Sequence, residues 1–264
     1  MPPAIDTITS TGTAIGAVLA ATTIAAGDSF TIKNAPLNSD VLLLQAWVDA
    51  QVAGMVRIRS PKFHDNVDAI RSRTLIGILE PLLPMGAPQK LYPQDTEIVE
   101  LAGSAVAGDI ESVVQLVYYA DLPGQAARLI TPDVLKQRQR NLLGVRVVIV
   151  CAVTGGYGGA AAINSAVDLL KANTDYAVLG MTTDVEAAAI CLRGPDTGNL
   201  RVAVPGEPGL WHVVNDWFVR LSKAYNLALI PVINSANKGG TLIDAVSDEN
   251  AATLNVTIWL AELG

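Results

Sequence analysis

Asn38–Asp49 of this chain reads NSDVLLLQAWVD, and Asn173–Asp184 reads NTDYAVLGMTTD. Both stretches place Asn, Asp, Leu and Asp at the same four positions. Each then continues into an apolar segment that closes on Arg-x-Pro, at Arg59–Pro61 in the first and Arg193–Pro195 in the second. Matching landmarks in one order indicate that a single module is written twice in this sequence.

The ends of the two halves are also alike. Val117–Leu122 reads VYYADL, and Ile258–Leu263 reads IWLAEL. A duplicated module produces a chain with two similar faces. Such a chain suits an assembly of repeated units better than a single catalytic pocket.

Composition sets the class of the protein. A chain of 264 residues is long enough for two domains, which agrees with two copies of one module. Half of the residues are apolar and 16% are charged, which is enough for two cores with apolar surface left for interfaces. The net charge of −7 argues against nucleic-acid binding. We interpret the densest basic group, Lys136, Arg138 and Arg140, as a solvated helix face.

The start of the chain has no export or membrane signal that we recognise. Residues 2–30 contain no Lys or Arg, so the apolar run Thr13–Ala26 lacks the basic beginning of a signal peptide. The run is also too short and too rich in Ala and Thr to cross a bilayer. We therefore expect a protein made without export. Cys151 and Cys191 lie in apolar strands, and we expect them to be buried and reduced.

Most apolar segments have the residue types of strands bounded by Gly, Pro, Asn and Asp. Only five residues separate Met181 from Ala187, which is too few for a parallel crossover, so we expect a hairpin there and between Trp47 and Met55. Runs of antiparallel strands indicate sandwiches or barrels. The candidate strands are Phe30–Lys33, Val41–Trp47, Met55–Arg59, Glu97–Leu101, Val113–Tyr119, Val145–Cys151, Tyr176–Met181, Ala187–Leu192, Leu227–Ile233 and Leu254–Leu260.

Two helices are predicted. Thr131-Pro132-Asp133 combines an N-cap hydroxyl, a proline in the first turn and an acid, and predicts a helix that runs to about Asn141 between the two halves. The second covers Trp211–Tyr225, where Val214, Trp217, Phe218, Leu221 and Tyr225 share one face. The first half has a Pro-rich loop, Pro81–Pro93, where this second helix would lie.

A dinucleotide-binding motif is the sharpest enzymatic candidate. In the segment Val147–Ala161, an apolar strand runs into a glycine-rich stretch in which Gly156, Gly158 and Ala161 fit G-x-G-x-x-A. A helix-compatible stretch, Ala160–Ala172, follows, and Asp184 could hold a ribose. Asp184 is 28 residues after Gly156, farther than usual, and the first half repeats the framework without these glycines. We interpret the glycines as a flexible surface loop. An NAD(P)-binding oxidoreductase using the Gly155–Gly159 loop remains an alternative.

Other candidate residues favour structural interpretations. We expect His64 to be a polar turn residue and His212 to begin a helix, and no Cys/His cluster has metal-ligand spacing. Asp244, Asp248 and Glu249 indicate a solvated acidic turn, with a weak calcium site as the alternative. Among four tryptophans, we expect Trp47 and Trp259 to be core or inter-sheet residues; a sugar platform is the alternative. No catalytic, cofactor-binding or metal-ligating residue is predicted.

The duplicated framework resembles the double jelly-roll major capsid proteins of icosahedral, membrane-containing DNA viruses, of which the small corticovirus-like bacteriophage type is nearest in length. The residues that carry the resemblance are Ala26–Lys33, Asp175–Arg193 and Leu254–Leu263. It implies an all-β, mainly antiparallel fold of two tandem jelly-roll sandwiches with one linker helix and one inserted helix. The expected organisation is an N-terminal arm at 1–26, a first jelly roll at 27–124, a linker helix at 125–143 and a second jelly roll at 144–264.

The resemblance also implies a function in assembly. Three subunits with two sandwiches each would form a pseudo-hexameric homotrimer that tiles an icosahedral shell. The expected partners are neighbouring capsid subunits and minor capsid or membrane-associated virion proteins, without direct nucleic-acid binding. The expected location is the virion, after synthesis in the host cytoplasm, with the uncharged arm ordering against a neighbour. A carbohydrate-binding jelly-roll module is a further alternative.

Overall fold

A computed structural model of the chain describes most of its residues. The described residues are 2–12, 20–21, 23–24, 32–33, 35–36, 39–49, 54–63, 65, 67, 69–74, 81–102, 111–124, 127–151, 155–164, 168–247 and 252–264. They form an all-β fold in which every strand pairing is antiparallel, which confirms the predicted fold class.

The first half contains two sheets. One has the order β3 (Thr23–Ile24), β1 (Ala4–Gly12), β9 (Glu111–Tyr119), β4 (Val41–Asp49) and β7 (Gln89–Leu91). The other has the order β2 (Ala20–Ala21), β8 (Ile98–Ala102), β5 (Gly54–Arg59) and β6 (Ile70–Thr74).

The second half repeats this arrangement. One sheet has the order β10 (Leu129–Ile130), β16 (Ile230–Asn234), β13 (Asp175–Thr182), β18 (Ala252–Leu263) and β11 (Gln139–Cys151). The other has the order β12 (Tyr157–Ala162), β17 (Leu242–Val246), β14 (Ala187–Arg193) and β15 (Val202–Gly206).

The strand orders of the two halves correspond neighbour by neighbour. Strands β1, β9, β4 and β7 have the places of β11, β18, β13 and β16, and strands β2, β8, β5 and β6 have the places of β12, β17, β14 and β15. Only β3 and β10 lack a counterpart among the described strands. Each half is therefore a jelly-roll-like sandwich of a five-stranded and a four-stranded sheet, in which eight strands correspond. The repeat read from the sequence is a repeat of topology.

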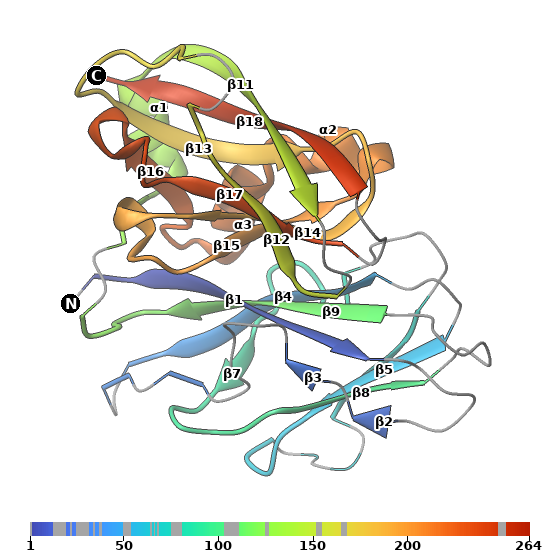
Figure 1. Cartoon of the computed structure of the whole chain (residues 1–264). Helices are drawn as coiled ribbons and strands as arrows, with labels where there is room; N and C mark the ends of the chain where they lie inside the picture. The colour runs from blue at the N-terminus through green and yellow to red at the C-terminus, as the bar shows by residue number, and fades with distance from the viewer. Residues whose placement is uncertain are drawn as a thin grey trace.

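The four sheets lie on one another as four layers (Figure 1). The sheet of β1, β9 and β4 lies next to that of β14 and β15, so these two layers join the halves. The outermost layer of the second half shows a clear alternation. Leu254, Val256 and Ile258 of β18 are buried, whereas Asn255 and Thr257 are half-exposed, as the alternating sequence predicts.

The hairpins expected after β4 and β13 are wrong. Strand β13 belongs to one sheet of its sandwich and β14 to the other, and the same is true of β4 and β5. Facing sheets lie about 10 Å apart, and an extended residue spans about 3.4 Å, so five residues are enough to cross from sheet to sheet. The loop length excluded a parallel crossover but did not distinguish a hairpin from this arch.

The N-terminal arm expected over residues 1–26 is wrong for Ala4–Gly12. These residues form β1, which pairs with β9 along its whole length, so the first sandwich begins at β1 and not at residue 27. Polar Thr and Ser residues in this strand hid it from a search for apolar runs. Of the strand expected at Phe30–Lys33, only Ile32 and Lys33 are described, and they lie outside any strand. The Pro-rich segment 81–93 contains the short strand β7.

The helices are shorter than predicted. Helix α1 (Pro132–Arg138) starts as expected, with the Thr131 Oγ1 accepting the N–H of Val134, but Gln139 is extended and starts β11. The second helix is divided into α2 (Trp211–Val214) and α3 (Trp217–Tyr225), with the expected Trp217, Phe218 and Leu221 buried. Three short 3₁₀ helices cover Pro195–Thr197, Pro208–Leu210 and Ser235–Asn237. Within the described ranges, no helix has the length and apolar character that crossing a membrane requires.

The close approach of α2 to β13 depends on Gly180. A Cβ at this position would lie 2.0 Å from the main-chain oxygen of Val214. We predict that Gly180→Ala lowers the free energy of unfolding by about 1–3 kcal/mol, because the helix must move. Gly239→Ala, where a Cβ meets no atom within 4 Å, is the control. Urea denaturation measures both; equal stabilities of the two variants would contradict this packing.

Candidate functional site at the seam between the halves

The two sandwiches share one continuous apolar core. The outer face of the β1–β9–β4 sheet is buried against the second half, and its side chains belong to the same cluster as those of β14 and β15. We call this contact the seam. Its first-half residues are Ile5, Leu44, Trp47, Val114, Leu116 and Tyr118. Burial of this face makes the two halves one body.

Trp47 lies at the centre of the seam. Its side chain is 1% exposed, and its Nε1 donates to the main-chain oxygen of Ala188 at 2.7 Å. The ring also meets Trp217 of α3 edge to face, with centroids 6.0 Å apart. An indole buried with its N–H bonded gives both apolar area and direction to a contact. The interpretation of Trp47 as an inter-sheet residue is confirmed.

Polar contacts fix the position of one half against the other. The N–H of Ala203 donates to Thr7 Oγ1 at 3.1 Å, and the hydroxyls of Thr9 and Tyr157 are 2.8 Å apart. The Tyr225 hydroxyl of α3 donates to the main-chain oxygen of Leu44. Buried hydrogen bonds are directional, so these contacts set one register where apolar packing alone would allow sliding.

The Tyr157 contact continues into a buried ion cluster. The guanidinium of Arg201 lies 3.7 Å from the centre of the Tyr157 ring, and its Nε donates to Asp244 at 3.3 Å. Arg193 donates to the same carboxylate oxygen at 2.9 Å. Asp244 is thus a residue of β17 held by two arginines rather than part of an acidic turn; Asp248 and Glu249 lie outside the described residues. Within the part of the chain that is described, no three His, Cys, Asp or Glu gather as a metal cluster.

A second ion cluster ties the linker to the second sandwich. Arg128 donates to both carboxylate oxygens of Asp175, at 3.0 and 2.6 Å, and lies 3.5 Å from Asp196. Asn234 donates to Asp175 as well. The hydrogen bonds from Arg128 hold the pKa of Asp175 below its usual value. Bidentate geometry of this kind orients the two groups more strongly than a single contact does.

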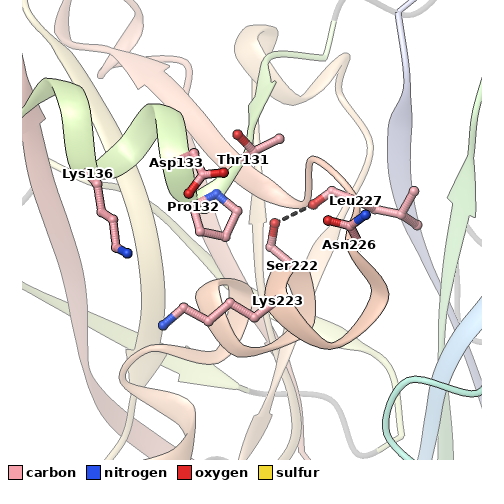
Figure 2. Close-up of a pocket in the computed structure, with 8 residues that line it drawn as sticks. All are labelled: Thr131, Pro132, Asp133, Lys136, Ser222, Lys223, Asn226 and Leu227. Atoms are coloured by element: carbon pink, nitrogen blue, oxygen red, sulfur yellow. Dashed lines mark hydrogen bonds between the residues drawn. The ribbon is translucent and has the colours of Figure 1, made fainter.

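One hollow near the linker lies between α1 and α3 (Figure 2). Its volume is about 310 Å³, and it is lined by Thr131, Pro132, Asp133, Lys136, Ser222, Lys223, Asn226 and Leu227. The Ser222 hydroxyl of α3 donates to the Leu227 carbonyl (Figure 2). None of the residues drawn there is a histidine that could activate it.

The glycine-rich motif lies in a strand. Tyr157–Ala162 forms β12 and pairs with β17, so the flexible loop and the helix expected after it are wrong for these residues. Gly159 has a φ of +70°, and a Cβ there would lie 2.8 Å from the main-chain oxygen of Val150 in β11. The glycine serves the close packing of two strands. Asp184 accepts from the main chain and side chain of Asn255.

The remaining candidates have structural places. Both cysteines are buried and neither forms a disulfide, as expected, and burial raises the pKa of Cys151 to about 11. His64 lies outside the described residues, and His212 is exposed in α2. Trp259 is half-buried and donates to Thr182 Oγ1 at 3.3 Å, and Trp211 is 59% exposed. Arg140 lies in β11, so only Lys136 and Arg138 of the basic group belong to the helix.

Sequence reasoning missed the polar residues that join the two halves at the seam. Thr7 and Thr9 lie in an unpredicted strand, and Tyr157 in an unexpected one. Their partners are 148 residues or more away along the chain. The one available signal was that β4 and β9 are apolar on both faces, which indicates burial from two sides.

These observations define an all-β protein of two jelly-roll-like sandwiches joined by a buried seam. No protein-family model and no curated protein matches the chain. Among solved structures, it is similar to the PBSX exported protein XepA, with 10% identity over 98% of this chain and 86% of that chain and a TM-score of 0.25. A second is the Sulfolobus Turreted Icosahedral Virus, with 9% identity, 98% and 82% coverage and a TM-score of 0.24. These TM-scores are too low to establish a common fold.

The seam hydrogen bond of Trp47 can be tested directly. We predict that Trp47→Phe lowers the free energy of unfolding by about 1–3 kcal/mol, because it leaves the buried Ala188 oxygen without its donor. Trp259→Phe removes an indole N–H on the half-exposed outer face and should cost less than about 1 kcal/mol. Denaturant unfolding compares them; an equal loss in both would argue against a special role of the seam.

The Arg128–Asp175 pair predicts a pH dependence. A lowered pKa in the folded state means that Asp175 adds stability above its unfolded pKa, near 3.8, and loses it as the pH falls through the lower folded value. We expect Asp175→Asn to be less stable than the wild type at pH 6, with the gap closing below about pH 4. Thermal unfolding between pH 3 and 6 measures this; a constant gap would contradict the charge interaction.

Proposed function

We propose that this protein is a viral structural protein, a major capsid protein whose copies assemble as pseudo-hexameric trimers into an icosahedral shell. The observation that carries the proposal is the repeated strand order, present twice in one chain and joined by a buried seam. Its role would be assembly without chemistry. Its partners would be other copies, together with minor capsid or membrane-associated virion proteins, and its location would be the virion.

The seam supplies a pattern for contacts between copies. Within the chain, the β1–β9–β4 sheet of the first sandwich meets the β14–β15 sheet of the second. Because the sandwiches correspond, the same contact between copies would place the β11–β18–β13 sheet of one chain on the β8–β5–β6 sheet of the next. Such a heterologous contact forms a closed ring if each chain is rotated by 120° from the previous one. The ring then contains six sandwiches from three chains.

The two outer faces that would meet between copies are more polar than the seam. Val114, Leu116 and Tyr118 on the outer face of β9 have Asn255, Thr257 and Trp259 as their equivalents on β18. The opposing face of the first half carries Arg57, Arg59 and Glu100, joined by hydrogen bonds of 2.6–3.2 Å. A contact between these faces would be more polar than the seam. Polar interfaces of this kind suit subunits that fold alone and associate afterwards.

The oxidoreductase alternative requires a glycine-rich loop followed by a helix, whereas Tyr157–Ala162 forms strand β12. A glycan platform needs aromatic rings gathered on one exposed surface. Trp47 and Trp217 are buried in the seam, and among the four tryptophans only Trp211 is largely exposed. Neither alternative has an observation in its favour.

Oligomer size tests the proposal. Light scattering after size exclusion should give three times the 27.6 kDa subunit mass, and electron microscopy should show ring-like trimers or shells. We predict that Thr257→Glu weakens trimer association about tenfold or more, because it adds a charge to the contact face. Gln137→Glu, on the exposed side of α1, is the matched control. A wild-type protein that stays monomeric at all concentrations would refute the trimer.

A further inference from the structure

The Lys33 side chain reaches an aspartate inside the first sandwich. Asp6 of β1 lies on the same side of the strand as Ala4 and Ile8, which belong to the apolar cluster of this sandwich. Asp6 is 5% exposed, so its carboxylate is removed from water. The Nζ of Lys33 donates to this carboxylate from the rim, where the lysine side chain remains 39% exposed. A charged pair therefore lies where the alternation of the strand predicts an apolar side chain.

The second sandwich shows that the fold does not need this pair. Strand β11 has the place of β1 there, and its buried side is apolar, with Val145, Val147, Ile149 and Cys151. Removing two charges from water costs free energy that their mutual attraction does not always return. A reaction between Lys33 and Asp6 that removes both charges would end this cost.

A buried carboxylic acid lies in the same interior. Glu97 is 1% exposed. The N–H of Ile32 donates to the Asp95 oxygen at 2.9 Å, so the segment 32–33 runs beside the segment that leads into Glu97. Burial raises the pKa of Glu97 to about 8, although a hydrogen bond from Gln115 opposes this. Glu97 therefore carries a proton near pH 7 and is able to donate it.

Tyr119 of β9 connects the three groups. Its hydroxyl accepts the main-chain N–H of Lys33 at 3.2 Å. Burial raises the pKa of this hydroxyl, and the charges of Asp6 and Glu97 raise it further. Both carboxyl groups therefore lie within electrostatic reach of one tyrosine that also holds Lys33. An amine, a carboxylate and a protonated acid share this interior.

We propose that Lys33 and Asp6 form an intramolecular isopeptide bond, with Glu97 as the group that transfers the protons. The ion pair first exchanges a proton, which leaves a neutral amine and a carboxylic acid. The Nζ lone pair of Lys33 then attacks Cγ of Asp6, and the C–N bond forms. Glu97 donates its proton to the leaving hydroxyl and accepts one from the nitrogen, so the C–O bond breaks and water leaves. The products are a neutral amide, one water and Glu97 in its original protonation state.

The fold favours a bond that does not form between an acid and an amine free in water. Well-oriented intramolecular groups reach effective concentrations of about 10⁵–10⁸ M. Burial of Asp6 keeps bulk water away from the new carbonyl. The bond would tie β1 to the segment 32–33 in the first sandwich, whose own apolar clusters are smaller than the cluster of the second. It lies within one subunit, so it does not depend on the proposed assembly.

The intact mass of the denatured full chain tests the proposal. We expect the wild type to be lighter than its sequence mass by one water. Trypsin gives a second readout, because no Lys or Arg precedes Lys33 and the next one is Arg57. A blocked Lys33 should leave one looped peptide that ends at Arg57, in place of two peptides that end at Lys33 and at Arg57. Cleavage after Lys238, whose ion pair with Asp168 lies at the surface, should be normal.

Three variants separate the bond from an ordinary ion pair. Lys33→Arg keeps the opposite charges and should have its full sequence mass. Glu97→Gln keeps the shape of the side chain and should also retain the water. Glu100→Gln, which removes a carboxylate on the outer face of β8, should lose water as the wild type does. A full wild-type mass with normal cleavage after Lys33 would overturn the bond, and loss of water in Glu97→Gln would overturn the role of Glu97.

Discussion

Burial of the outer face of the β1–β9–β4 sheet is the constraint on which the rest of the structure depends. This sheet is covered on one side by its own sandwich and on the other by the second half. Strand β9 is accordingly buried at every position. A large apolar side chain removed from water contributes about 1.5–3 kcal/mol, so six such residues hold the halves together firmly. The hydrogen bonds of Thr7, Thr9 and Trp47 then fix a single register.

Duplication of the module did not duplicate its surfaces. The outer face of β9 is apolar because the second half covers it, whereas that of β18 carries Asn255 and Thr257 and meets solvent. The interiors differ as well, with Gln115 in one sandwich where the other has Val256. Backbone topology is set by strand pairing and tolerates such changes, so each copy was free to adapt to its own surroundings.

The sequence predicted the strands that are long and apolar, such as β4 and β9, and the start of α1, where Thr131 and Pro132 act locally. It missed β1, since polar residues of that strand face partners from the other half, Ala203 and Tyr157. It also misinterpreted β12 as a flexible loop. Gly159 is needed there because the backbone of β11 packs too close to leave room for a side chain. The candidate site could not be predicted from the sequence either, because its residues contact partners that are distant in the sequence. Asp244 reads as part of an acidic turn until Arg193 and Arg201 are seen beside it.

By itself, the sequence determined that this chain is an all-β protein built from one module used twice. Strand and turn preferences depend on neighbouring residues, and the repeated landmarks can be recognised in the sequence itself. Only the tertiary structure decided that the short connections are arches, that the halves meet sheet on sheet, and that Glu97 lies buried beside Gln115. These outcomes depend on which residues meet across more than a hundred positions, where burial and hydrogen bonding, not local preference, select the partner.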